Sequence, residues 1–255
     1  MKRPTKDNWN ADLYDGNHAF VSQYGESVMD LLAPKKGEKI LDAGCGTGDL
    51  ANQLHQRGAH VIGIDQSQNM IQQAQHKYPD ITFEVQDMLT LAYHDTFDAV
   101  FSNATLHWIK QPRQALQSIY NSLHTGGRLV AELGGKGNVQ LITDAIIQQI
   151  ERMDIPYTQE QFPWYFPSIG EYTSLMEEVG FTVTFAHHFD RPTPLAGEDG
   201  LRNWIEMFAG SILAEQPDTL KEQLIQQVEQ SLREVLYQDG QWVADYKRLR
   251  VIGVK

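Results

Sequence analysis

The chain has 255 residues, of which 41% are hydrophobic and 21% charged, values that are ordinary for a globular protein with a substantial core. Its formal net charge of −12 disfavours nucleic acid as a partner, because phosphate binding requires clustered lysine and arginine. No apolar run approaches the length needed to cross a bilayer, and residues 1–7 lack the apolar core of a signal peptide. A single cysteine excludes a framework of intrachain disulfides. We therefore expect a cytoplasmic protein, a monomer or homodimer with no membrane partner.

Short apolar runs alternate with amphipathic stretches through the middle of the chain, which is the pattern of βαβ units in a parallel sheet. One helix of this pattern has both of its ends marked, by a capping box at Ser168–Glu171 and by Gly180 after its last residue. The expected strands are 39–43, 60–65, 82–86, 97–102, 128–133, 181–189 and 242–254, and the expected helices lie near 17–32, 47–57, 67–78, 112–124, 138–153, 169–179, 199–214 and 219–237.

Two regions interrupt this alternation, and neither is expected to form a separate domain. In residues 1–35 an apolar stripe at helical spacing follows Trp9 and Tyr14, and we expect this segment to close over a pocket as a lid. Residues 191–241 are an insertion that we expect to form a helical cap over the substrate cavity. The chain is thus predicted to be a single domain, 1–255. The last helix of the cap has an apolar residue at every fourth position, at Leu220, Leu224, Val228, Leu232 and Leu236.

Residues 40–48 read Ile-Leu-Asp-Ala-Gly-Cys-Gly-Thr-Gly, a short apolar strand that runs into a glycine-dense turn. The next strand ends on Asp65, so a glycine turn and a carboxylate are expected at the carboxyl ends of parallel strands, where nucleoside cofactors bind. The glycine spacing is G-x-G-x-G, with Asp49 where a dinucleotide fingerprint has its third glycine. A carboxylate at that helix N-terminus would repel a pyrophosphate, whereas a cationic nucleoside such as S-adenosylmethionine would tolerate it.

These motifs resemble those of the class I S-adenosylmethionine-dependent methyltransferases. Residues 42–48 look like motif I and residues 63–67 like motif II, while Asp87-Met88 and residues 101–108 resemble motifs III and IV. The Leu-His-Trp ending of the last motif is similar to the branch that holds trans-aconitate methyltransferase and the malonyl-carrier-protein methyltransferase of biotin synthesis. The resemblance implies an α/β fold with a Rossmann-like doubly wound sheet of seven strands, the final one antiparallel, and S-adenosyl-L-methionine as the cofactor.

The candidate cofactor site combines this resemblance with the chemistry of the residues. Asp65 can accept hydrogen bonds from both ribose hydroxyls, although it could instead cap the following helix. Asp42 could fix the loop amides or reach the ammonium group of the ligand through water, and Asp87 with Met88 would suit the adenine ring. The expected cofactor-binding residues are Tyr14, His18, Asp42, Gly44, Cys45, Gly46, Gly48, Asp65, Gln66, Asp87, Met88, Ser102 and Asn103.

His107 is the expected catalytic residue, because a histidine here could take a proton from a substrate hydroxyl or donate a hydrogen bond to a substrate carboxylate. It could equally brace its own loop. Trp108 is expected to form a wall of the substrate pocket. Arg191 and Arg202 in the cap could bind the carboxylates of an acidic acceptor, although both could simply face solvent.

The predicted function is methyl transfer to a small molecule, to the oxygen of a carboxylate or a hydroxyl. A non-catalytic protein that binds S-adenosylmethionine and regulates a partner is the alternative. Methylation of nucleic acid is disfavoured by the acidic balance and by the lack of an Asn-Pro-Pro-Tyr-type motif. No metal is expected, because His187 and His188 alternate across a strand and cannot chelate one ion together.

Overall fold

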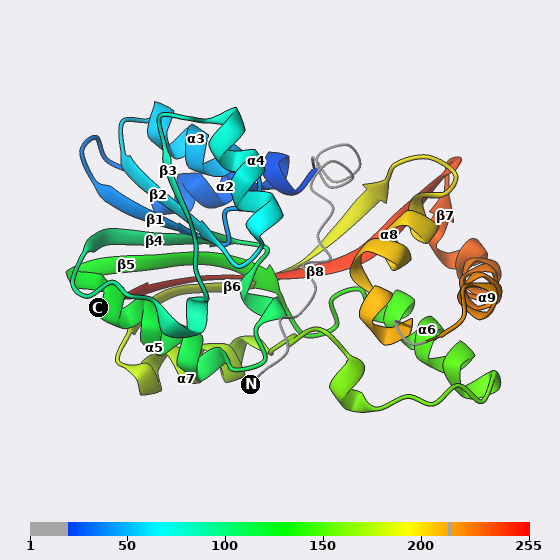
Figure 1. Ribbon diagram of the computed structural model, residues 1–255. Helices are drawn as coiled ribbons and strands as arrows, with labels where there is room; N and C mark the ends of the chain where they lie inside the picture. The colour runs from blue at the N-terminus through cyan, green and yellow to red at the C-terminus, as the bar shows by residue number, and fades with distance from the viewer. Residues whose placement is uncertain (1–19, 214–215) are drawn as a thin grey trace, which may run out of the picture. The chain divides into compact units, whose positions relative to one another are not determined.

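A computed structural model describes residues 20–213 and 216–255 of the chain (Figure 1). The chain divides into two compact units. Unit 1 holds the described residues up to Leu133, together with Pro167–His187 and Leu249–Lys255. Unit 2 holds Gly134–Phe166 and His188–Arg248. Among the helices of the described residues, not one has the length and apolar character of a membrane span.

The described residues form one sheet of eight strands in the order β3-β2-β1-β4-β5-β8-β6, with β7 paired to β8. Strands β1 to β5 are parallel, because β1 pairs with β2 and β4, β2 with β3, and β4 with β5, all in the same direction. The predicted α/β doubly wound sheet is confirmed, and the short β7 is the strand that the prediction lacked. The strands are β1 (Lys39–Ala43), β2 (His60–Asp65), β3 (Thr82–Val85), β4 (Phe97–Asn103), β5 (Leu123–Gly134), β6 (Thr182–Leu195), β7 (Tyr237–Gln238) and β8 (Gln241–Val254).

The last strand runs against its neighbour, as expected. Lys255 donates its backbone N–H to the Gly127 carbonyl at 2.9 Å and accepts one from Gly126 at 2.8 Å, so this end of the chain is held antiparallel to the start of β5. In β1 and β4 almost every residue is buried, because helices cover both faces of a parallel sheet. This explains why both strands have apolar residues at consecutive positions, 40–41 in β1 and 99–101 in β4.

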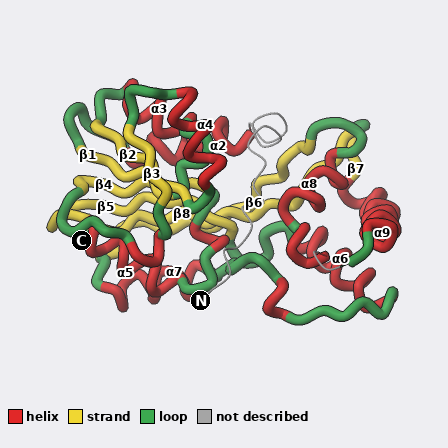
Figure 2. The backbone as a smooth tube through the Cα atoms, viewed as in Figure 1, coloured by secondary structure: helices red, strands yellow, loops and turns green. Residues whose placement is uncertain are grey.

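The helices of unit 1 lie on both faces of the sheet (Figure 2). Helices α2 (Phe20–Leu32), α3 (Asp49–Gln56) and α4 (Gln68–Lys77) are on one face, and α5 (Pro112–Ser122) and α7 (Ile169–Val179) are on the other. The capping box predicted for α7 is confirmed: the Glu171 carboxylate accepts from the Ser168 N–H at 2.7 Å, and the Ser168 hydroxyl accepts from the Glu171 N–H at 3.2 Å. Gly180 ends this helix in the left-handed conformation, with φ of 119°.

Unit 2 contains α6 (Gln140–Arg152), α8 (Gly200–Phe208) and α9 (Asp218–Leu236). The predicted apolar stripe of α9 is buried at Leu224, Val228, Leu232 and Leu236, while Leu220 is half-buried. The helix predicted for 199–214 is shorter than expected, because α8 ends at Phe208 and a separate 3₁₀ turn covers Gly210–Leu213. A glycine at position 210 favours this break.

The predicted cap, 191–241, lies within unit 2, which is larger than that segment because it also includes Gly134–Phe166. Of the predicted lid, 1–35, only α2 and the residues after it belong to the described part of the chain. The organisation as a single domain with a lid and a cap therefore stays a prediction.

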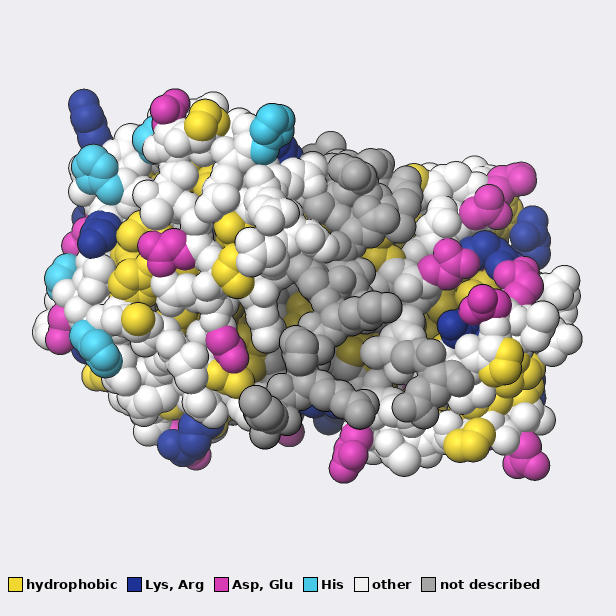
Figure 3. Space-filling model, viewed as in Figure 1, with side chains coloured by type: hydrophobic (Ala, Val, Ile, Leu, Met, Phe, Trp, Pro, Cys, Tyr) yellow, Lys and Arg dark blue, Asp and Glu magenta, His cyan; other side chains and the backbone are white. Residues whose placement is uncertain are grey.

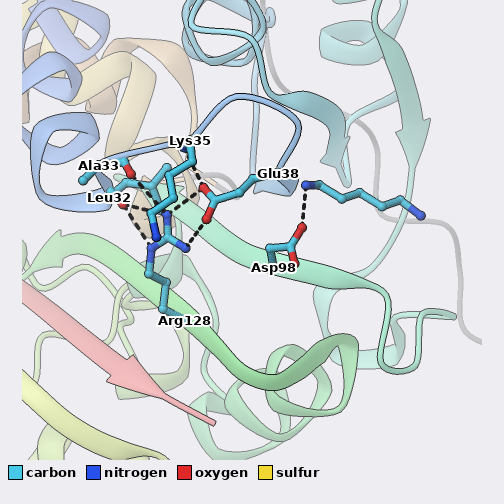
Figure 4. Close-up of polar contacts among 7 residues, drawn as sticks. Leu32, Ala33, Lys35, Glu38, Asp98 and Arg128 are labelled. Carbon is cyan, nitrogen blue, oxygen red and sulfur yellow. Dashed lines mark hydrogen bonds and ion pairs between the residues drawn. The ribbon is translucent and has the colours of Figure 1, made fainter.

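An arginine on β5 joins three elements at the amino-terminal end of the parallel strands (Figure 4). The Arg128 guanidinium donates to both carboxylate oxygens of Glu38 at 2.9 Å and to the Leu32 carbonyl at 2.8 and 3.0 Å. The end of α2, the residue before β1 and β5 are thereby held together. The hydrogen bond from Arg128 holds the pKa of the Glu38 carboxyl below its usual value of 4.5. A bidentate pair that also caps a helix is worth more than an exposed ion pair.

We expect Arg128→Met to lower the free energy of unfolding at pH 7 by about 1.5–3 kcal/mol, as is typical for lost hydrogen bonds between charged groups. Because the pKa of Glu38 is lower in the folded protein, its contribution is present above pH 4.5 and is lost as the pH falls through the folded pKa. Urea unfolding checks both expectations. The control is Arg57→Met, which removes an exposed pair with Asp30 and should cost at most about 0.5 kcal/mol. Equal losses in the two variants would contradict the role of Arg128.

Candidate active site

The candidate site lies in unit 1, where the carboxyl ends of β1, β2 and β4 carry the glycine turn, Asp65 and the segment 102–108. Two glycines of the turn serve different purposes. A Cβ atom at Gly44 would overlap the Thr105 side chain, so this glycine is required by packing within the protein. Among the described residues, a Cβ atom at Gly46 would meet nothing within 4 Å, and the φ of Gly46 is 53°. No described side chain therefore lies over the Gly46 backbone, and a ligand can approach it closely.

Asp65 holds this turn in place. One of its carboxylate oxygens accepts from the Gly46 N–H at 3.1 Å, and the other accepts from the Ser67 N–H at 2.9 Å. Helix α4 has its own cap, because the Ser67 hydroxyl accepts from the Met70 N–H at 3.2 Å. Capping of α4 is thus done by Ser67. A carboxylate has about four acceptor positions, so it can accept from backbone amides and from hydroxyls such as those of a ribose.

Asp42 is buried at the end of β1, with 1% of its surface exposed. Its oxygen Oδ2 has no hydrogen-bond partner among the described residues. Burial raises the pKa of Asp42 to about 7, and the negative charge of Asp65 adds to this effect. The expectation that Asp42 fixes the loop amides is not met at Gly46, whose N–H is bound by Asp65 instead. Asp42, with one carboxylate oxygen unbonded among the described residues, lies beside a second acid, Asp65, and near the backbone of Gly46. This arrangement fits a ligand that carries positive charge.

Cys45 lies in the same turn but faces inward. Its Sγ atom is 3.0 Å from where a Cβ of Gly63 would be, so the thiol packs beneath β2. Burial and the neighbouring acids Asp42 and Asp65 raise the pKa of the thiol well above its usual value. The side chain is therefore a buried thiol that stays neutral.

Asp49, the acid in the place of the third glycine, has a different environment from the one expected. Its carboxylate forms an ion pair with Lys77 at 2.7 Å and accepts a hydrogen bond from the Tyr78 hydroxyl at 2.6 Å. Much of its charge is thus compensated, and the expected repulsion of a pyrophosphate by Asp49 is weaker than the sequence suggested. No spacing in the sequence indicates Lys77 as the partner of Asp49, because Lys77 lies at the far end of α4.

The residues proposed for the adenine ring follow β3. Asp87 caps a short 3₁₀ turn (Met88–Thr90) by accepting from the Leu89 N–H at 2.9 Å, and Met88 is 7% exposed. The Gln86 N–H donates to the Asp65 carbonyl at 3.0 Å, which fixes the start of this loop to the end of β2. Gln66 is exposed and lies next to Asp65 in sequence.

The end of β4 faces the glycine turn. The buried Ser102 hydroxyl donates to the Ala43 carbonyl at 2.8 Å, and Asn103 is buried beside it. Ala104 takes a left-handed conformation with φ of 56°, which a non-glycine residue adopts only under strain. This bend brings the Thr105 hydroxyl within 3.2 Å of the Gly44 carbonyl. Sequence reasoning missed Thr105, because a single threonine in a loop carries no recognisable pattern.

His107 and Trp108 belong to the 3₁₀ turn Leu106–Trp108. His107 is 6% exposed, its ring centroid lies 5.7 Å from that of Trp108, and the two planes are inclined by 33°. The turn is closed by a hydrogen bond of 2.9 Å from the Trp108 N–H to the Thr105 carbonyl. The same threonine that touches the glycine turn therefore also supports the loop of His107.

The remaining site predictions lie outside this cluster. Tyr14 and His18 fall outside the described residues. Arg202 of unit 2 is bound by Glu222 at 2.6 Å and Glu229 at 2.7 Å. Acidic and basic side chains gather over α8 and α9 on the face shown in Figure 3. Because two carboxylates compensate its charge, this arrangement gives no support to Arg202 as a substrate ligand. Arg191 lies over the Phe189 ring at 5.1 Å. Among the described residues, no group of three or more His, Cys, Asp or Glu could hold a metal ion.

Comparison with known proteins gives matches in sequence and in structure. The family model described as a methyltransferase domain matches residues 34–180. An uncharacterized methyltransferase of Schizosaccharomyces pombe is 32% identical over 270 residues, covering 98% of this chain and 99% of the yeast protein. Trans-aconitate 2-methyltransferase of Escherichia coli is 32% identical over 130 residues, covering 49% of this chain and 50% of that enzyme.

A solved structure of phosphoethanolamine N-methyltransferase 2 from Haemonchus contortus, in complex with S-adenosylhomocysteine, has a TM-score of 0.60 to this chain. Its sequence identity is 19%, and the match covers 96% of this chain and 56% of that one. At this identity the likeness shows the fold alone.

The environment of Asp42 predicts how a variant changes stability with pH. Because its pKa is higher in the folded state than the usual 3.8, its contribution to stability is present at low pH and is lost as the pH rises through about 7. Asp42→Asn replaces the carboxyl group by an amide of the same size, which is neutral at every pH. The stability that it gains over the unaltered protein should therefore be larger at pH 8 than at pH 5, by roughly 2–3 kcal/mol.

Urea unfolding of the ligand-free protein at the two pH values measures this difference. Asp30→Asn, which alters an exposed acid, is the matched control and should show no such pH dependence. A difference between Asp42→Asn and the unaltered protein that is the same at both pH values would contradict the assignment.

Proposed function

Because this chain belongs to the S-adenosylmethionine-dependent methyltransferase family, we propose that it methylates an oxygen atom of a small molecule, a carboxylate or a hydroxyl. The proposal is supported by the similarity over half of the chain to an enzyme named for methylation of trans-aconitate, an acid. The observation that carries it is the buried His107 on the loop that follows β4, next to the residues that would surround the transferred methyl group.

The candidate residues fit the parts of the cofactor. Asp65 would bind the ribose hydroxyls, and the orphaned oxygen of Asp42 would attract the ammonium group. Met88 and Asp87 would contact adenine, while the bare backbone at Gly46 would let the methionine portion lie close to the turn. S-adenosylmethionine supplies an electrophilic methyl group on a positively charged sulfur.

The protein's own task is to align the acceptor and exclude water. Fixed alignment alone can contribute on the order of 7–11 kcal/mol to lowering the barrier. A carboxylate acceptor is ionised at neutral pH and needs no base, so His107 would then donate a hydrogen bond to it. A hydroxyl acceptor has a proton to lose, and His107 would take that proton as a general base.

A non-catalytic protein that binds the cofactor and regulates a partner remains the second candidate. Its distinguishing outcome is tight cofactor binding without turnover. No residue arrangement in the described part of the chain favours this regulatory role over catalysis. The cytoplasmic location and the oligomeric state expected from the sequence also stay predictions.

Incubation with labelled S-adenosylmethionine and a library of carboxylic acids, phenols and amines tests the proposed function. We expect methyl transfer to an acid or a hydroxyl compound. With a hydroxyl acceptor, His107→Ala should lower kcat by about 10²–10⁴-fold, the usual contribution of general acid–base catalysis, with little change in cofactor affinity. Transfer to amines alone would contradict the proposal, and cofactor binding without any transfer would favour the regulatory alternative.

Asp65→Ala should weaken the binding of S-adenosylhomocysteine by about 1–3 kcal/mol, because charge-assisted hydrogen bonds to the ribose are lost. Isothermal titration calorimetry measures this loss, and circular dichroism checks that the fold persists. Asp30→Ala, which removes an exposed acid, should bind as the unaltered protein does. Unchanged affinity of a folded Asp65→Ala variant would remove Asp65 from the site.

A further inference from the structure

The surroundings of Asp42 are acidic rather than neutralising. In the sheet, Asp42 pairs with Gly63 of β2 and Phe101 of β4, neither of which carries charge. Among the described residues, the charged group that acts on Asp42 is the Asp65 carboxylate at the end of β2, and the other titratable group beside it is the thiol of Cys45. β4 also contributes neutral Ser102, whose hydroxyl is bound to Ala43. An ionised Asp42 would thus be a buried negative charge beside the partly buried carboxylate of Asp65.

Burial makes such a charge costly unless it is paired. Asp42 is 1% exposed, and its Oδ2 atom has no hydrogen-bond partner among the described residues. A buried carboxylate without a cation is destabilised, and the group favours its neutral form instead. Gly46 lies in the turn that follows Asp42, and among the described residues nothing lies within 4 Å of where its Cβ would be.

We propose that Asp42 carries a proton in the free protein, and that the positively charged ammonium end of the cofactor displaces this proton when it binds. The inference rests on the proposed function, because it takes S-adenosylmethionine or its product as the ligand. The O–H bond of the carboxyl group breaks, the proton passes to a buffer base in solvent, and the carboxylate formed pairs with the ammonium group. Cofactor affinity is therefore coupled to pH in the neutral range.

The sign of this coupling follows from the pKa of Asp42, which burial raises to about 7. Below that value, binding requires the loss of a proton, so the affinity should fall up to tenfold for each unit of pH. Above it, Asp42 is already ionised and the affinity should be nearly constant. Binding at pH 6 should release about 0.9 proton and binding at pH 8 about 0.1 proton.

Calorimetric titration in two buffers of different ionisation enthalpy counts these protons directly. The probe is S-adenosylhomocysteine, which has the ammonium group. 5′-Methylthioadenosine, which has the same nucleoside and a thioether but no amino-acid end, is the matched ligand. We expect it to bind without proton release and with the same Kd at pH 6 and pH 8. Proton release of equal size with both ligands would overturn the proposal.

Asp42→Asn identifies the group. This variant should bind S-adenosylhomocysteine without releasing a proton and with a Kd that does not change between pH 6 and pH 8, whereas Asp30→Asn should behave as the unaltered protein. A proton released by Asp42→Asn as in the unaltered protein would overturn the proposal. If the variant does not fold, the comparison of the two ligands on the unaltered protein decides.

The outcomes separate this proposal from the function on which it rests. Tight binding of S-adenosylhomocysteine at pH 6 with no proton released would overturn the role of Asp42 and leave the proposed function standing. No binding of S-adenosylhomocysteine at any pH would overturn both.

Discussion

The Asp65 carboxylate is the group on which the candidate site depends, because its hydrogen bonds fix backbone segments that the sheet does not join. One oxygen binds the glycine turn at Gly46 and the other binds the start of α4 at Ser67. The Asp65 carbonyl also accepts from Gln86, so the loop after β3 is held to the same residue. Three loops therefore keep their positions relative to the end of one strand, and the site is organised before a ligand arrives.

The selectivity of this site follows from its charge. Asp42 and Asp65 are close enough to raise the pKa of Asp42, and a ligand that brings phosphate would add negative charge to both. A sulfonium and an ammonium group would instead compensate them. The acid at position 49 contributes less than the sequence suggested, since Lys77 already neutralises it. Preference for a cationic nucleoside thus depends on Asp42 and Asp65 and not on the acid at the helix N-terminus.

Local signals predicted most of the fold. The bounds of β1, β2 and α7 agree with prediction, because a buried strand, a capping box and a terminal glycine each act within a few residues. The family and its cofactor, expected from motif I, are also confirmed. Contacts between distant residues were not predictable: Thr105 against Gly44, Lys77 against Asp49 and the Arg128–Glu38 pair each join different elements, and no periodicity or spacing marks them. The early end of α8 was missed because apolar residues continue past it.

A crystal structure of the protein with bound S-adenosylhomocysteine tests the central claim most directly, since it locates each part of the ligand. The account predicts that the two ribose hydroxyls lie within hydrogen-bond distance of the Asp65 carboxylate and that the homocysteine portion lies against Gly46 and near Asp42. A ligand whose ribose is bound elsewhere, with no hydrogen bond to the Asp65 carboxylate, would contradict it.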